Sequence, residues 1–145
     1  MIGIITEKGD ANRKTVIMAF NYHNSIIIDS ARACDPYKLL DYIDIDMLDS
    51  VYVISIESVY RFRSAIRLLP SWIKKLDIKR IFVTFPVGFY SYNNRLEDNK
   101  VLEDSYRILL KIEKRYGTSV FASLPNQEPY HSIVRRYCII GEIDD

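Results

Sequence analysis

The fold is decided by residues 51–85, which read VYVISIESVYRFRSAIRLLPSWIKKLDIKRIFVTF. Val51–Ser55 and Ile81–Phe85, at its two ends, are short runs rich in β-branched and aromatic residues, as in strands that are buried on both faces. Ser58–Leu76, between them, has apolar residues at the period of an amphipathic helix. Pro70 is expected to bend or interrupt this helix. A strand, a helix and a strand in this order predict a βαβ unit with parallel strands.

The same alternation continues on both sides of this unit. Further strands are predicted at Ile2–Thr6, Ile26–Asp29, Val120–Leu124 and Ile133–Ile140. Further helices are predicted at Lys14–Tyr22, Pro36–Ile43 and Lys100–Tyr116. Asp35 is expected to cap the second of these helices, and Gly117 is expected to end the third. Strands that alternate with helices predict an α/β fold, with a mostly parallel central sheet and helices on both faces.

The composition is that of one soluble globular domain. The chain has 145 residues, of which 48% are hydrophobic and 27% are charged, and this excludes disorder and repetitive fibres. Its formal net charge of +1 gives no overall attraction to nucleic acid or to anionic membranes. Cys34 and Cys138 stand far apart, which argues against a structural zinc site and fits a reducing compartment. Since no apolar run is long enough to cross a membrane, we expect residues 1–145 to form one cytoplasmic domain.

The segment after the first predicted strand has the position of a phosphate-binding loop. It reads TEKGDANRKT over Thr6–Thr15, and an apolar helix follows. In such a loop, backbone N–H groups surround phosphates, while a closing Lys-Thr pair contacts the terminal phosphates and Mg²⁺. Lys8 and Arg13 stand where the consensus has glycines, and Gly9 lies one place out of register. Side chains at the glycine positions are expected to distort or fill the loop.

Four stretches carry a family resemblance, namely Ile2–Thr15, Ser25–Leu40, Leu48–Tyr92 and Lys100–Gln127. In order and in hydrophobic pattern they resemble the core of the RecA/RadA recombinase ATPase family, the archaeal RadA and RadB branch more than the bacterial one. The first stretch resembles the Walker A strand and loop. The third looks like a strand, a long helix and the Walker B strand. The resemblance implies a three-layer P-loop NTPase fold of RecA type, trimmed to a minimal core.

Several positions depart from the motifs of that family. Thr84 stands where the Walker B strand ends in an Asp that holds Mg²⁺, and a hydroxyl cannot supply that negative charge. Asp29 is followed by Ser, Ala and Arg where the family places a catalytic Glu. By resemblance, the vestigial nucleotide-binding residues are Gly9, Arg13, Lys14, Thr15 and Thr84, and no residue is assigned a catalytic role. We therefore expect no hydrolysis and no bound cofactor, although the resemblance names ATP and Mg²⁺ as the candidates.

Two further regions are candidates for nucleic-acid contact. Pro86–Asn99 is the longest predicted loop, and its Tyr90 and Tyr92 are placed to stack on bases. Arg135 and Arg136 break the apolar run of the last predicted strand, either as charges that protect an edge strand or as contacts to phosphate. No histidine lies at ligand spacing from a carboxylate or a cysteine, so we expect no metal site.

Two local patterns have a plain structural interpretation. Asp35–Asp49 holds five Asp and one Lys, whereas Arg61–Arg80 holds seven basic residues and one Asp. Each is interpreted as a solvated helix face. Phe62–Ala65 reads FRSA, which spells the Phe-x-x-Ala of self-association in the RadA family. It lies on the apolar stripe of a helix, so Phe62 is expected in the core.

These observations favour a non-hydrolysing RecA-like domain that serves as an accessory or regulatory partner, related by the resemblance to DNA recombination or repair. Its partner would be an ATPase-competent paralogue or a second copy of the chain, because a trimmed sheet exposes edge strands. One alternative is a nucleotide-binding switch that holds ATP or GTP weakly at Lys14 and Thr15. Another is a nucleic-acid-binding module without catalysis, which would have affinity that falls steeply with salt.

Overall fold

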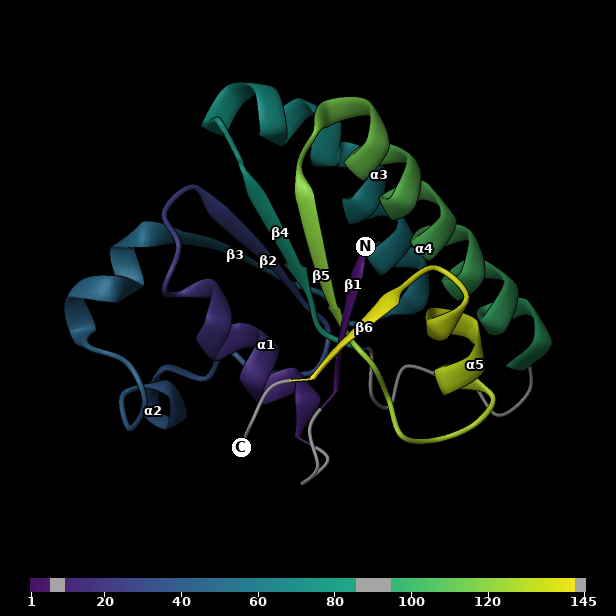
Figure 1. Cartoon of the computed structure of the whole chain (residues 1–145), viewed down its shortest axis with the longest axis horizontal. Coiled ribbons are helices and arrows are strands. Elements are labelled where there is room, and N and C mark those ends of the chain that lie inside the picture. Colours follow the sequence, from purple (N-terminus) through teal and green to yellow (C-terminus); the bar gives the residue numbers. More distant parts are fainter. Residues whose placement is uncertain (6–9, 86–94, 143–145) are drawn as a thin grey trace.

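The computed structural model describes residues 1–5, 10–85 and 95–142, and it has an α/β fold built on one sheet (Figure 1). Within these ranges the strands are β1 (Ile2–Ile5), β2 (Ser25–Asp29), β3 (Val51–Ser55), β4 (Arg80–Val83), β5 (Ser119–Ser123) and β6 (Ile139–Glu142). The helices are α1 (Ala11–Ala19), α2 (Pro36–Leu39), the 3₁₀ helix η1 (Ile45–Ser50), α3 (Val59–Leu76), α4 (Arg95–Tyr116) and α5 (Tyr130–Arg135). The strands all run parallel, in the order β3-β2-β4-β5-β1-β6.

Helices cover both faces of the sheet (Figure 1). On one face, α1 and α2 pack on β2 and β4, with Val16 against Ile27 and Phe82. On the other face, α3, α4 and α5 enclose a second core, in which the rings of Phe62 and Tyr106 lie 5.9 Å apart. Right-handed crossovers explain why the helices are divided between the two faces. The connections from β1 to β2 and from β2 to β3 run in one direction along the sheet, whereas the three later connections run in the other direction. The predicted parallel sheet between two helical layers is confirmed.

Most predicted elements are present with shifted ends, and two expected caps are confirmed. Asp35 caps α2 by accepting the N–H of Tyr37 at 3.0 Å, and Gly117 follows α4 with a φ of 65°. Pro70 is expected to bend or interrupt α3, and the structure contradicts the interruption, since the helix is continuous from Val59 to Leu76. A proline costs about 3 kcal/mol inside a helix, whereas each buried Phe, Ile or Leu contributes about 1.5–3 kcal/mol. α4 begins at Arg95, so the end of the predicted loop is helical.

The predicted strand over Ile133–Ile140 is wrong. Its first part forms α5, and β6 begins at Ile139, where the chain pairs with Ile2 of β1. Arg135 closes the turn between them, because its guanidinium donates to the carbonyl oxygen of Cys138 at 2.7 Å. The β-branched residues before this turn are buried in the second core from a helix. Tertiary packing here overrides their preference for a strand.

The connections leave three pairs of neighbouring strands whose loops diverge at the carboxyl edge of the sheet. β1 and β2 lead into the helical layer of α1 and α2, whereas β3, β4 and β5 lead into that of α3, α4 and α5. The diverging neighbours are therefore β5 with β1, β2 with β4, and β2 with β3. Ligands of open α/β sheets bind in such crevices. We therefore expect a site in one of these three places.

Candidate functional site

The crevice between β5 and β1 lies under the N-terminus of α1, where the sequence predicts a phosphate site. Asp10 caps this helix, since its Oδ1 accepts the N–H of Arg13 at 3.2 Å. Its Oδ2 lies 3.2 Å from Nε of the same arginine. The positive end of the helix dipole thus already faces a carboxylate. The guanidinium of Arg13 also lies 5.1 Å from the ring centre of Tyr42, so this cation is held on two sides.

The Lys-Thr pair of the predicted phosphate loop lies in the first turns of α1. Lys14 is partly exposed there. Thr15 is fully buried, and its hydroxyl donates to the carbonyl oxygen of Ala11 at 2.7 Å. This hydroxyl is therefore bonded within the helix instead of facing a ligand. Gly9, which the sequence groups with these residues, lies outside the described ranges.

Asn12, in the first turn of α1, forms hydrogen bonds across this crevice. Its Oδ1 accepts the N–H of Phe85 at 2.8 Å, and its Nδ2 donates to the carbonyl oxygen of Phe85 at 3.4 Å. Ser123, at the end of β5, donates its hydroxyl to Asn12 Oδ1 and accepts the N–H of Phe85 at 2.8 Å. The amide of Asn12 thus pairs with Phe85 as the peptide of a neighbouring strand would. No sequence pattern indicates this contact, because one polar residue in a first turn carries no signal for it.

Thr84, at the position of the Walker B acid, joins β4 to β2 across the second crevice. It is fully buried, and its Oγ1 accepts the N–H of Ser30 at 2.8 Å and donates to Oδ1 of Asp29 at 3.1 Å. The hydroxyl of Ser30 in turn donates to the carbonyl oxygen of Thr84 at 2.9 Å. These bonds close the crevice between β2 and β4 with the chain's own groups. They also engage the Thr84 hydroxyl both as donor and as acceptor.

Asp29 organises the loop that leaves β2. Its buried carboxylate accepts three backbone N–H groups, from Ala31 and Ala33 at 3.1 Å and from Cys34 at 2.9 Å. Burial, and after it the charge and hydrogen bond of Asp29, raise the pKa of the Cys34 thiol far above its ordinary value. The thiol therefore stays protonated and unreactive. Arg32, in the middle of this loop, has a left-handed backbone with a φ of 55°.

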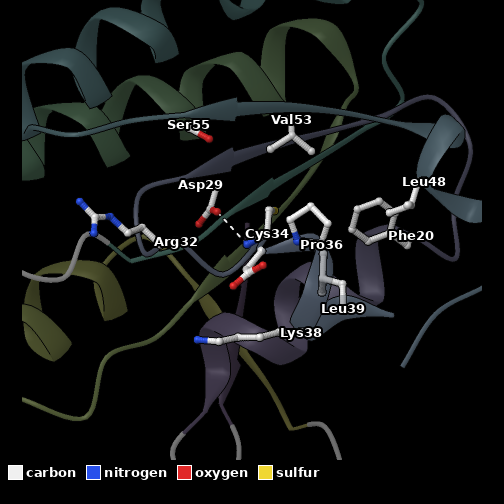
Figure 2. A pocket seen from close by; sticks show the side chains of 11 residues that line it. Phe20, Asp29, Arg32, Cys34, Pro36, Lys38, Leu39, Leu48, Val53 and Ser55 are labelled. Atoms are coloured by element: carbon white, nitrogen blue, oxygen red, sulfur yellow. Dashed lines mark hydrogen bonds between the residues drawn. The ribbon is translucent and has the colours of Figure 1, made fainter. Parts of the chain in front are cut away.

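The third crevice, between β2 and β3, contains a cavity of about 730 Å³, which we call the β2–β3 cavity (Figure 2). It is bordered by the loop after β2, by α2, by η1 and by the edge strand β3. Arg32 and Lys38 extend toward one end of the cavity, whereas Phe20 and Leu48 lie at the other (Figure 2). Val53 of β3 lines it between these ends and is 42% exposed. No pattern in the sequence groups these residues.

Of the residues predicted to contact nucleic acid, Arg135 and Arg136 do not join any of the three crevices. Arg135 and Arg136 lie at the end of α5, just before β6 begins, and therefore near the amino edge of the sheet. Nη1 of Arg136 lies 3.2 Å from Oε1 of Glu103 on α4, so this charge is paired. The crevices are at the opposite, carboxyl edge. Tyr90 and Tyr92 fall outside the described ranges.

The basic helix α3 is partly neutralised, and its Phe-x-x-Ala sequence is buried. Phe62 and Ala65 belong to the second core, as expected. Arg63 and Arg67 each lie 3.5 Å from Asp104 on α4. Over residues 1–5, 10–85 and 95–142, no three His, Cys, Asp or Glu side chains are grouped to hold a metal ion. Over the same ranges, no helix combines the length and the apolar character needed to cross a membrane.

Comparison with known proteins assigns no family to the chain. No protein-family model matches it, and no curated protein matches its sequence. The resemblance to the RecA/RadA core therefore stays a prediction, and function has to be inferred from the three crevices.

Proposed function

We propose that the chain is a non-hydrolysing domain of RecA type that acts as an accessory or regulatory protein. The observation that carries the proposal is at the N-terminus of α1, where the Asp10 carboxylate binds the backbone N–H group that would otherwise face a phosphate. The hydroxyls of Thr15 and Thr84 are both bonded inside the protein. A Mg²⁺ ion in this region would therefore lack the ligands that the family motifs supply.

Electrostatics at α1 favours the exclusion of phosphate. A helix N-terminus attracts an exposed anion by about 0.3–1 kcal/mol. Two unit negative charges about 4 Å apart repel each other by about 1 kcal/mol in water and about 4 kcal/mol near a protein surface. The Arg13 guanidinium, paired with Asp10 at 3.2 Å, offsets part of this repulsion and is itself engaged in the pair. The helix N-terminus, Asp10 and Arg13 together therefore offer a phosphate little net attraction. Lys14 is left as the cation of the first turn that could attract a phosphate.

An accessory role requires a contact surface, and the two edges of the sheet are candidates. β3 and β6 are the edge strands, and on them Tyr52 and Ile139 are 47% and 77% exposed. Edge strands with exposed apolar side chains favour pairing with another chain. The partner would be an ATPase-competent paralogue or a second copy. The tie to DNA recombination or repair comes with the sequence resemblance.

The proposal predicts that phosphate release at millimolar MgATP equals that of a buffer blank, and that MgATP leaves the melting temperature unchanged. Asp10→Ser keeps a capping oxygen without the charge, and it should still show no turnover because Thr84 supplies no metal ligand. Lys14→Ala and the exposed Lys74→Ala on α3 form a matched pair. Turnover that is lost in the first and kept in the second would contradict the proposal. A raised melting temperature without turnover would favour the nucleotide-binding switch.

A further inference from the structure

Among the described residues, the crevice between β2 and β3 is the one in which we find a cavity. Hydrogen bonds of Asn12 cross the crevice between β5 and β1, and those of Thr84 cross the one between β2 and β4. The third crevice keeps a cavity of about 730 Å³. Small-molecule sites usually have roughly 300–1,000 Å³, and in open parallel sheets they lie at the carboxyl edge where neighbouring loops diverge. Both the size and the position of this cavity are therefore those of a ligand site.

The acidic and the basic side chains around the cavity differ in whether the protein already binds them. The Asp29 carboxylate is used by three backbone N–H groups and the Thr84 hydroxyl. Asp35 accepts the N–H of Tyr37 as the cap of α2. By contrast, Arg32 and Lys38 form no ion pair with any residue in the described part of the chain. Besides the Ser55 hydroxyl and the second oxygen of Asp35, the groups left to receive a ligand are thus the cationic donors of Arg32 and Lys38.

The loop geometry holds Arg32 beside the cavity. Its φ of 55° is a conformation that costs an ordinary residue roughly 1–2 kcal/mol. Asp29 fixes that conformation, because its Oδ1 binds the backbone N–H groups of Ala31 and Ala33 on either side. The backbone that carries the arginine is therefore preorganised, which lowers the backbone entropy that would be lost when a ligand binds there.

The other end of the cavity is apolar. Phe20 and Leu48 face each other there, and Val53 lines the wall toward β3 (Figure 2). A ligand that matches the whole cavity therefore carries an apolar group at one end and a negative charge at the other. A divalent cation would meet the two free cations, so it does not fit.

We propose that the β2–β3 cavity binds a small organic anion, with an aromatic or branched aliphatic body and one carboxylate or phosphate group. The body packs against Phe20 and Val53, and the anionic group is bound by Arg32 and Lys38. This proposal is independent of whether the domain hydrolyses nucleotide, because it concerns a different crevice.

The probe for this site is 8-anilinonaphthalene-1-sulfonate, an aromatic body with one anionic group whose fluorescence rises in apolar surroundings. We expect saturable binding to the folded full chain at one site. Two competitors, 3-phenylpropionate and phenyl phosphate, separate a carboxylate-selective site from a phosphate-selective one, and either should displace the probe. Benzyl alcohol, which is neutral, should displace it at least about tenfold less well, because one charge-assisted pair is worth about 1.4 kcal/mol or more.

Four variants locate the binding. Val53→Trp should weaken the probe at least about tenfold by filling the apolar end, and it should fold because Val53 is partly exposed. Arg32→Gln and Lys38→Gln should each weaken it by about three- to tenfold. Arg61→Gln, an equal charge change on exposed α3, should have no effect. Near-UV circular dichroism and cooperative unfolding establish that each variant is folded.

Three results would overturn the proposal. The first is the absence of saturable binding to the wild-type chain. The second is binding that folded Val53→Trp leaves unchanged, or that Arg61→Gln weakens as much as Arg32→Gln does. The third is displacement by benzyl alcohol as effective as that by the two anions.

Discussion

The crevice under α1 and the β2–β3 cavity have equivalent places in the fold, but they differ in what fills them. Both lie at the carboxyl edge, between strands whose loops leave on opposite sides of the sheet. Under α1, Asn12 and Ser123 bond to Phe85, so these polar groups are already paired with one another. In the β2–β3 cavity there are apolar walls and two cations, Arg32 and Lys38, that form no ion pair with any described residue. Topology thus creates several candidate sites, and side chains decide which one stays open.

The two crevices differ in the free energy that a ligand would have to expend to enter them. A ligand that entered the crevice under α1 would have to replace the hydrogen bonds of Asn12 and Phe85, and each buried group left unpaired costs about 1–3 kcal/mol. A ligand in the β2–β3 cavity would replace only water around Arg32 and Lys38. Asp29 belongs to two neighbouring crevices. Its carboxylate accepts the Thr84 hydroxyl in the crevice between β2 and β4, and it accepts backbone N–H groups of the loop that borders the β2–β3 cavity. Variants of Asp29 therefore test the whole arrangement.

The largest effect is expected for Asp29→Ala. The substitution leaves three backbone N–H groups and the Thr84 hydroxyl without their acceptor. We expect a loss of about 3–4 kcal/mol in the free energy of unfolding, measured by urea denaturation. The variant should also lose binding of the anionic probe, because the loop that presents Arg32 is no longer fixed.

Two control variants should lose less unfolding free energy than Asp29→Ala does. Asp29→Asn keeps one carbonyl acceptor for Ala31 and Ala33 but turns an N–H₂ toward Cys34, so it should be intermediate. Thr84→Val keeps the volume but removes one partner of Asp29 and the acceptor of the Ser30 N–H, so it should cost about 1–3 kcal/mol. A loss below about 1 kcal/mol in Asp29→Ala would mean that water replaces the carboxylate easily. Asp29 would then not be the residue that stabilises both the Thr84 contact and the loop beside the β2–β3 cavity.

A smaller effect is expected for Asn12→Ala, which opens the closed crevice. Phe85 keeps Ser123 as an acceptor for its N–H, so the loss in unfolding free energy should be about 1–2 kcal/mol. Asn12→Asp retains the acceptor and is favourable in a first helical turn, so it should lose less than half as much. Urea denaturation of the two variants measures the difference. Equal losses would show that the amide donor at 3.4 Å, and not the acceptor, holds Phe85.

The sequence predicted the layers better than the site. Hydrophobic period was enough to find α3, because its buried residues form one continuous apolar stripe. The β-branched and aromatic run of β3 also indicated a strand, but its expected burial on both faces is wrong, because β3 is an edge strand on which Tyr52 and Val53 are exposed. Hydrophobic period failed at Ile133–Ile140, where β-branched residues are buried from a short helix. Of the candidate site, sequence order placed Lys14 and Thr84 next to the crevices. Sequence order could not predict the hydrogen bonds of Asn12, because its partners Phe85 and Ser123 lie 73 and 111 residues away in the chain.

The smallest expected effect concerns Cys34 on the wall of the open cavity. Burial and the neighbouring Asp29 raise its pKa in the folded protein, so folding favours the protonated thiol. This contribution to stability is complete below the unfolded pKa of about 8.5 and is lost as the pH rises above it. Between about pH 8.5 and 9.5, the wild-type chain should therefore lose about 1 kcal/mol more unfolding free energy than Cys34→Ser does. Cys138, whose pKa is raised to about 11 in the core, is present in both chains and cancels in the comparison. Parallel pH profiles would show that the Cys34 thiol ionises as readily in the folded chain as in the unfolded one, and that the charge of Asp29 does not reach the cavity.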